Sequence, residues 1–394
     1  MLTRRDFSLS LCALPLAPRA AAPRGPWDGP ATLAKVYLAG TTVHWPTPAL
    51  DLEREKARID AALAEVETKH AGALRFSGGA LLRRDEDVEP FLKQVGGVDG
   101  LLIVPIAQPV GPLRPLVAAS RLPMLFFAVP YASHAWSGIG AMQREGTRIA
   151  AVASSSFGDL DPYVPVFRAI HHLRNSKVLV AAQSPRGRQE TADAFSKQFG
   201  TAMTFLGYND LEAAFQAADA RQAERDAAAL TRSALRVVEP KPAEIRDGLR
   251  FYHGLAGLLE RHQANAFTID CFGGLLAKTL PAYPCIAWSK LNDEGRYGVC
   301  EGDLRSTMTQ MLVTPCAGVP GFVTDPVFDT SRNEVIHAHC VSATRLKGFH
   351  APPSPFILRS HLETAEGAVM QVLVPSNETV TVGVFASPKK FLVS

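Results

Sequence analysis

The sequence lacks the long apolar runs and the charge bias that are typical of membrane-spanning and nucleic-acid-binding proteins. Past residue 25, no segment reaches the ~18–20 unbroken apolar residues that a spanning helix needs. The formal net charge is only +3 over 394 residues, and no dense stripe of lysine and arginine stands out. Neither a nucleic acid nor an anionic membrane surface is therefore expected as a partner.

Cysteine is scarce, and its spacing excludes two common uses. The chain has six cysteines and no CxxC pair. The five that lie past residue 25 all fall in the C-terminal third: Cys271, Cys285, Cys300, Cys316 and Cys340. This pattern is neither a disulfide framework nor a zinc-finger spacing. We therefore expect most of these cysteines to be small buried side chains.

The N-terminus carries a short basic and apolar leader, "TRRDFSLSLCALPLAPRAAAP". Arg4 and Arg5 are followed by Phe7, a mildly hydrophobic run and small residues at 20–22. This order resembles a bacterial twin-arginine export signal, which carries folded proteins across the membrane. We therefore expect residues 1–25 to be a signal peptide and the protein to be periplasmic. A disordered basic leader is the alternative.

The rest of the chain predicts an α/β fold. A chain of this length is expected to form two or three domains. Wholly apolar strand patterns alternate with helical ones, as a parallel sheet covered on both faces requires; the strands are expected at 34–43, 98–107, 123–130 and 266–270. We predict two doubly wound parallel-sheet domains, at 30–150 and 151–315. Short alternating runs at 316–394 predict a small antiparallel β domain, barrel-like in form.

One stretch near the C-terminus, "CEGDLRSTMTQMLVTPCAGVPGFVTDPVF", suggests a metal site. Residues 301–312 are expected to form a helix about 18 Å long. A strand over 318–324 would then return roughly 20 Å. These lengths allow Glu301 and Asp325 to become neighbours at the edge of the sheet where ligands bind.

Histidines supply the remaining candidate ligands. His337 and His339 are two positions apart in "VIHAHC", so both are expected on the same face of a strand. His361 lies in "RSHLE". Two carboxylates with one or two imidazoles suit Mn²⁺, Mg²⁺, Co²⁺ or Zn²⁺. Each residue alone also has a structural explanation, because Glu301 could interact with a helix dipole and Asp325 could end a strand.

The same stretch resembles the L-fucose isomerase and L-arabinose isomerase superfamily. In that family an acidic cluster, a helix and a strand ending in aspartate supply two metal ligands, which correspond to Glu301 and Asp325. The resemblance implies a C-terminal histidine as the last ligand, for which His361 is the first choice, and an additional one at His339. It also implies two doubly wound domains and a β-barrel domain. The shorter C-terminal region and the leader place this chain on an outlying branch.

The chemistry that the resemblance implies is aldose–ketose isomerisation through an enediol. A divalent metal, with Mn²⁺ as the first expectation, would polarise the carbonyl of a small sugar substrate. Glu301 and Asp325 would also move the proton as general base and acid, and the assignment between them stays open. The family further implies a homo-oligomer, a trimer or a hexamer.

Other polar residues at expected strand ends are candidate substrate contacts. Asp270 follows the strand 266–270, and His44 and Trp45 follow the first strand. Lys290 and Asn292 lie in "WSKLNDEGRYGVC", which is expected to be a polar loop beside the acidic pair. A plain strand–helix turn explains Asp270 equally well.

Two other functions compete with the isomerase. Two α/β domains also describe an exported carbohydrate-binding protein, and a homologue of the isomerases could keep the fold without catalysis. The pair Glu301 and Asp325 distinguishes the isomerase from the carbohydrate-binding protein, because a protein that only binds sugar does not need carboxylates held by a metal.

Overall fold

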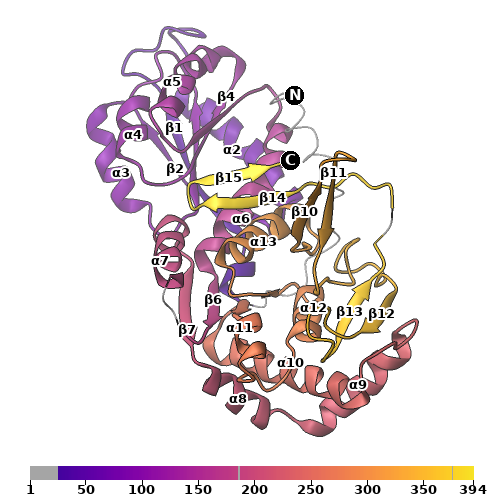
Figure 1. Ribbon diagram of the computed structural model, residues 1–394. Coiled ribbons are helices and arrows are strands. Elements are labelled where there is room, and N and C mark those ends of the chain that lie inside the picture. Colours follow the sequence, from indigo (N-terminus) through magenta and orange to yellow (C-terminus); the bar gives the residue numbers. More distant parts are fainter. Residues whose placement is uncertain (1–24, 185–186, 375) are drawn as a thin grey trace. The chain divides into compact units, whose positions relative to one another are not determined.

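The computed structural model describes residues 25–184, 187–374 and 376–394. Residues 1–24 of the expected export signal lie outside this range. The chain divides into two compact units, one formed by Asp28–His171 and the other by Gly25–Trp27 with His172–Ser394. Among the described residues, no helix is long and apolar enough to cross a membrane. Each unit contains one parallel sheet with helices on both faces, which confirms the α/β class (Figure 1).

The first unit is built on a five-stranded parallel sheet. Its strands follow the order β2-β1-β3-β4-β5, that of a doubly wound sheet. The strands are β1 Ala31–Leu38, β2 Leu74–Leu82, β3 Gly100–Pro105, β4 Met124–Ala128 and β5 Ile149–Ala153. The helices are α2 Leu52–Lys69, α3 Val88–Gln94, α4 Leu113–Ala119 and α5 Ile139–Arg144, with shorter 3-10 turns η2 Asp85–Asp87, η3 Pro130–Gly138 and η4 Phe157–Tyr163.

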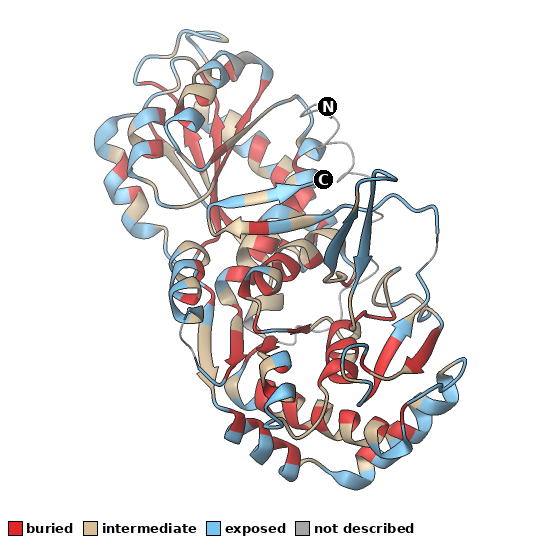
Figure 2. Ribbon diagram, in the orientation of Figure 1, coloured by how far each residue is buried: buried red, intermediate tan, exposed pale blue. Residues whose placement is uncertain are grey.

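Alternation along the strands explains why helices cover both faces of this sheet. Successive strand side chains point to opposite faces. Leu102 and Val104 of β3 therefore join one buried cluster, while Leu101 and Ile103 join another. Strands β3 and β4 are buried throughout (Figure 2), as parallel strands between helical layers are, whereas β2 and β5 are only partly buried.

The first unit extends further than the sequence suggested. The boundary expected at residues 150 and 151 falls inside β5, which pairs with β4 in register. After β5, Leu160, Val164 and Phe167 are buried in the core of the first sheet. Helix α6 (Val164–Asn175) therefore begins in the first unit, and the division follows His171.

The second unit contains a four-stranded parallel sheet in the order β7-β6-β8-β9. Its strands are β6 Lys177–Ala181, β7 Ala202–Leu206, β8 Ala266–Ile269 and β9 Tyr297–Val299. Its helices are α7 Arg188–Phe199, α8 Tyr208–Ala217, α9 Ala220–Ser233, α10 Pro242–His262, α11 Cys271–Leu276, α12 Cys285–Asp293 and α13 Leu304–Ala317. The side chains of β6 and β8 again divide between two clusters, one on each face.

Three antiparallel hairpins follow α13. They are formed by β10 Asp325–Asp329 with β11 Glu334–Ala338, β12 Phe356–Arg359 with β13 Val369–Val372, and β14 Gly383–Ser387 with β15 Lys390–Val393. Phe385 packs with Phe195 of α7, at 5.5 Å between ring centroids, and Leu358 packs with Leu249 of α10. The hairpins thus extend the core of the second unit. In the part of the chain that is described, each forms its own two-stranded sheet.

Candidate metal centre

Polar side chains follow two neighbouring strands of the second sheet. Strand β8 ends at Ile269 and is followed by Asp270, while β9 ends at Val299 and is followed by Cys300 and Glu301. These strands run parallel to each other and to β6. Their carboxyl ends therefore lie at one edge, where open α/β sheets bind their ligands.

Glu301 has a backbone conformation that non-glycine residues rarely adopt. Its φ angle is +67°, and that of Gly302 is +63°. The N–H of Gly302 donates to the carbonyl oxygen of Ile269 at 2.8 Å. Asp303 then accepts from two backbone N–H groups of α13, so the helix expected from residue 301 begins at Leu304. A left-handed non-glycine residue costs about 1–3 kcal/mol, and such residues are enriched at active sites and ligand-binding sites.

Asp325 reaches the site by a different route from the one expected. The strand predicted over 318–324 is wrong, because these residues are irregular and Asp325 begins β10. Pro320 cannot donate to a β-ladder, and glycine weakens a strand. Asp325 instead pairs with Ala338 across the β10–β11 hairpin, which places it beside the next residue, His339.

Glu301, Asp325 and His339 bring three ligand atoms together. His339 Nε2 lies 3.9 Å from Glu301 Oε1 and 3.8 Å from Asp325 Oδ2, and all three atoms are within 4.8 Å of one another. Atoms ~2.1 Å from one octahedral ion lie ~3.0 Å apart at right angles and ~4.2 Å apart in line. The two separations fall between these values, so the side chains would have to shift by up to about 1 Å to take ideal octahedral positions. The three residues could then hold one divalent ion, and their donor set suits Mn²⁺, Mg²⁺, Co²⁺ or Zn²⁺.

The two carboxylates are accessible and the imidazole is not. The side chains of Glu301 and Asp325 are 53% and 69% exposed, whereas that of His339 is 5% exposed. The other ring nitrogen of His339, Nδ1, lies 3.8 Å from Cys340 Sγ. A solute can therefore approach the carboxylates directly, while the partly buried Cys340 sulfur and the N–H of Val341, 3.3 Å from Nδ1, orient the ring.

The proximity of these charges shifts two pKa values. Partial burial and the neighbouring Asp325 carboxylate raise the pKa of Glu301. Burial alone would lower the pKa of His339, but the Cys340 sulfur and the two carboxylates outweigh it and raise this pKa to about 9. In the absence of a metal, the protonated imidazole balances the carboxylates at neutral pH. A bound cation would displace that proton.

Asp270 lies at the same edge and is paired with Arg188, a residue that no sequence motif indicated. Arg188 Nη2 is 3.2 Å from Asp270 Oδ2 and 3.3 Å from the carbonyl oxygen of Glu301. Arg188 begins α7, over 100 positions before Glu301. Only the folded topology brings this cation to the site.

His361 belongs to a different ligand group from the three ligand atoms, although the family resemblance made it the first choice of histidine. Its ring is buried beside Tyr283, at 5.5 Å between ring centroids, and belongs to a different group with Cys285 and Cys340. The reason is that His361 follows β12, whose hairpin packs on α10, whereas His339 directly follows β11.

Lys290 and Asn292 have structural contacts. The expected polar loop is helix α12. The buried side chain of Asn292 accepts from the N–H of Gly298 at 3.0 Å and donates to its carbonyl oxygen at 3.1 Å. The Lys290 ammonium lies 4.9 Å from the ring centroid of Tyr252. Both residues thus stabilise the packing of α12.

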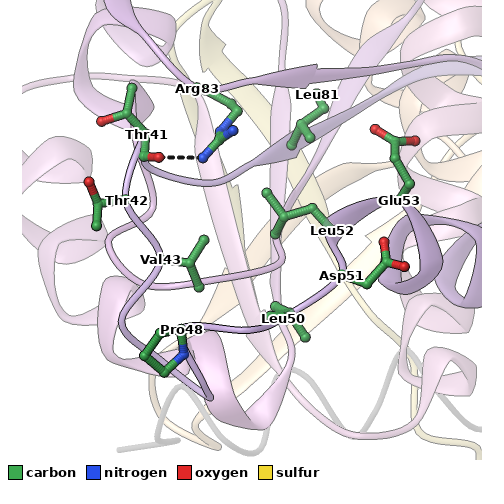
Figure 3. A pocket seen from close by; sticks show the side chains of 10 residues that line it. All are labelled: Thr41, Thr42, Val43, Pro48, Leu50, Asp51, Leu52, Glu53, Leu81 and Arg83. Carbon is green, nitrogen blue, oxygen red and sulfur yellow. Dashed lines mark hydrogen bonds between the residues drawn. The ribbon is translucent and has the colours of Figure 1, made fainter.

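His44 and Trp45 belong to the first unit, at the carboxyl end of β1. The N–H of His44 donates to the carbonyl oxygen of Gln108 at 2.8 Å, and Trp45 is 51% exposed. A pocket of about 570 Å³ opens nearby. Figure 3 shows Arg83 in this pocket, donating to the carbonyl oxygen of Thr41; the other lining residues are Thr42, Val43, Pro48, Leu50, Asp51, Leu52, Glu53 and Leu81.

The sequence interpretation missed a convergence of cysteines. Four of the five that lie past residue 25 are linked by contacts: Cys271 contacts Cys300, and Cys340 contacts both Cys300 and Cys285. Their sequence separations carry no signal, because each comes from a different segment of the second unit.

Comparison with known proteins leaves the geometry of the site as the main guide to function. No protein-family model matches the chain, and a search of curated proteins finds no match.

Proposed function

We propose that Glu301, Asp325 and His339 hold a divalent metal ion, Mn²⁺ in the first instance, and that the protein is a sugar isomerase or a close relative of one. The observation that carries the proposal is the meeting of three ligand atoms within 4.8 Å at the carboxyl edge of the second sheet. The resemblance of residues 300–325 to the fucose and arabinose isomerases supports the choice of an aldose as substrate.

The proposed reaction is a proton transfer between two carbons of an open-chain aldose. The metal, when bound, supplies Lewis acidity that polarises the carbonyl and acidifies the neighbouring hydroxyl. Glu301 Oε1 faces the other ligands, which leaves Oε2 to remove the proton from C2. The electron pair forms the enediol while O1 gains a proton. Return of the carbon proton to C1 and loss of the O2 proton give the ketose.

The two carboxylates divide the proton transfers between them in this proposal. Glu301 takes the carbon-bound proton, because its raised pKa matches a general base better than an ordinary carboxylate does. Asp325, the more exposed of the two, exchanges the hydroxyl protons. Arg188 holds the turn at Glu301 in place by donating a hydrogen bond to the Glu301 carbonyl oxygen.

The wider expectations belong to the same proposal. A homo-oligomer, trimeric or hexameric, is supported by the β10–β11 hairpin, which exposes Val327, Phe328, Val335 and Ile336 to solvent (Figure 2). Closure of the C-terminal hairpins into a barrel and export to the periplasm are proposed on the resemblances alone.

The test is turnover of aldoses that carry deuterium at C2. The full chain is loaded with Mn²⁺ and offered a panel of pentoses, hexoses and deoxyhexoses. We expect ketose to form, with deuterium transferred to C1 or lost to water. Glu301→Gln should abolish both, while Glu334→Gln, at the far end of the same hairpin, should leave them unchanged. Ketose formation by Glu301→Gln at the wild-type rate would contradict the role given to this residue.

A carbohydrate-binding protein is the second candidate, and the pocket of the first unit favours it. Hydroxyl, carboxylate and guanidinium groups line that pocket beside leucines, a combination that suits a small polar ligand. Sugar binding that needs no metal and is abolished by Arg83→Ala would support this reading. Metal retention without turnover of any sugar would indicate an isomerase homologue that has lost catalysis.

A further inference from the structure

A second group of potential ligands lies in the interior of the second unit. Cys285 begins α12, Cys340 follows β11 and His361 follows β12. One ligand atom from each lies within 4.8 Å of the other two. Cys285 and His361 are buried, and Cys340 is partly buried. Unlike the carboxylates of Glu301 and Asp325, this group offers sulfur and nitrogen.

The spacing of the two sulfur atoms matches a shared metal better than a disulfide. Cys285 Sγ and Cys340 Sγ are 4.0 Å apart. A disulfide needs ~2.05 Å, whereas two thiolates ~2.3 Å from one tetrahedral zinc ion are ~3.8 Å apart. The two sulfur atoms therefore already lie within a few tenths of an ångström of the separation that a shared zinc ion requires.

His361 is oriented as a metal-binding histidine usually is. Its Nδ1 lies 3.2 Å from Glu363 Oε2 and 3.4 Å from Thr364 Oγ1. The backbone of the same turn is fixed at both ends, since His361 N–H donates to Glu366 O at 3.0 Å and Ala365 N–H donates to His361 O at 2.9 Å. A carboxylate on one ring nitrogen leaves the other, Nε2, for a metal and holds the ring in place.

Cys340 lies at the centre of this group. Its sulfur is 4.0 Å from Cys285 Sγ and 3.8 Å from His339 Nδ1. Cys300 and His361 also contact it. Among the described residues, Cys300 and His339 form a further ligand group with Cys340, so Cys300 is the nearest candidate for a fourth ligand.

We propose that Cys285, Cys340 and His361 bind a thiophilic metal ion, such as Zn²⁺ or Cu⁺, with Cys300 as the fourth ligand. Sulfur and imidazole ligands select these ions over Mn²⁺ and Mg²⁺. The site is separate from the Glu301–Asp325 pair and does not depend on the proposed isomerase. His339 lies between the two, with Nδ1 toward Cys340 and Nε2 toward the carboxylates.

The test uses Co²⁺ and Zn²⁺ as probes on the reduced, metal-free full chain. Thiolate-bound Co²⁺ has an intense near-ultraviolet charge-transfer absorption that carboxylate-bound Co²⁺ lacks. We expect this absorption to saturate at one equivalent in the wild type. Cys285→Ser and His361→Gln should abolish or strongly weaken it. Cys316→Ser should keep it, because Cys316 belongs to none of the ligand groups found among the described residues.

Two further measurements keep the result decisive. The double variant Glu301→Gln/Asp325→Asn should retain the absorption, which separates this site from the proposed catalytic one. X-ray absorption of the zinc-loaded wild type should show sulfur at ~2.3 Å and nitrogen at ~2.0–2.1 Å, whether or not the cysteine variants fold. Oxygen-only coordination, or a Cys285–Cys340 disulfide in the isolated protein together with no metal uptake after reduction, would overturn the proposal.

Discussion

The two parallel sheets present carboxyl edges of opposite character. At the first edge, Gly40 N–H donates to the carbonyl oxygen of Pro109 at 2.6 Å, and the Arg83 guanidinium donates to the carbonyl oxygens of Gly40 and Thr41. The left-handed position there is Gly111, with φ +68°. At the second, the left-handed position is Glu301, and carboxylate, imidazole and thiol groups converge around it. No ligand group of this kind occurs at the first edge among the described residues.

At both edges the topology of the sheet determines where a site can form, and the side chains determine its chemistry. Both sheets share the doubly wound arrangement that opens a crevice at the carboxyl edge. Glycine removes the strain where the turn only has to close. At Glu301 the turn keeps a left-handed non-glycine residue, at a cost of about 1–3 kcal/mol.

The largest effect on stability is expected at the first edge. In Gly111→Ala, the new methyl group would lie 2.5 Å from the Ala39 carbonyl oxygen, and the backbone would remain left-handed. We expect the free energy of unfolding of the first unit to fall by at least about 1–3 kcal/mol, as measured by urea denaturation. Gly138→Ala meets no atom within 4 Å and should be nearly neutral. Equal effects of the two substitutions would contradict this account of the turn.

At the second edge, replacing the left-handed Glu301 by glycine should destabilise the second unit less than replacing it by alanine. Glu301→Gly relieves the left-handed strain that Glu301→Ala retains, so the glycine variant should be more stable than the alanine variant by about 1 kcal/mol. Both should lose metal binding, because neither has a carboxylate. A comparison of their thermal unfolding midpoints and Mn²⁺ content checks this. An alanine variant at least as stable as the glycine variant would show that the turn is unstrained.

The cap of α13 links stability to the position of Glu301. Asp303 accepts from the N–H groups of Arg305 and Ser306 at 2.8 and 3.2 Å. Asp303→Ala should lower the free energy of unfolding of the second unit by about 1 kcal/mol and weaken Mn²⁺ binding several-fold, as measured by calorimetry. Asp303→Asn retains a capping oxygen and should bind Mn²⁺ like the wild type. Weakening by the asparagine variant alone would assign Asp303 a direct role in the site.

The smallest effect concerns acid stability of the first unit. Burial acts to raise the pKa of Asp161, but His70 and Lys69 outweigh it and lower this pKa below its usual range. A carboxyl with a lowered pKa stabilises the fold above its unfolded pKa of ~3.9 and loses that contribution as the pH falls toward its folded value. Asp161→Asn should therefore reduce stability at pH 7 and reduce it less at pH 3, in urea titrations. A constant difference between wild type and variant at both values would contradict this.

Much of the fold could be predicted because its signal is local. The apolar runs of β1, β3, β4 and β8 and the amphipathic stripe of α2 each lie within one short segment. Strand β2 was not predicted because Gly78 and Gly79, both at positive φ, interrupt "LRFSGGALL". Its pairing with β1, with a register shift after Lys35, depends on the neighbouring strand.

Only the part of the site that lies within one short stretch of sequence could be predicted. Glu301 and Asp325 stand out as the acidic ends of one stretch, although the strand expected between them does not form. The choice of His339 over His361 required the register of the β10–β11 hairpin, which a turn with Asn333 at φ +55° sets. Arg188 and the cysteines reach the site only through long-range packing, so no local sequence pattern indicates them.

Equilibrium binding of Mn²⁺ to the metal-free full chain shows whether Glu301 and Asp325 hold a metal ion. Mn²⁺ prefers oxygen and imidazole ligands, so the cysteine group should not compete for it. The wild type and Glu334→Gln should each bind one equivalent with equal affinity. Glu301→Gln and Asp325→Asn should bind at least ~100-fold more weakly. Equal Mn²⁺ affinity in all four proteins would show that Glu301 and Asp325 hold no metal.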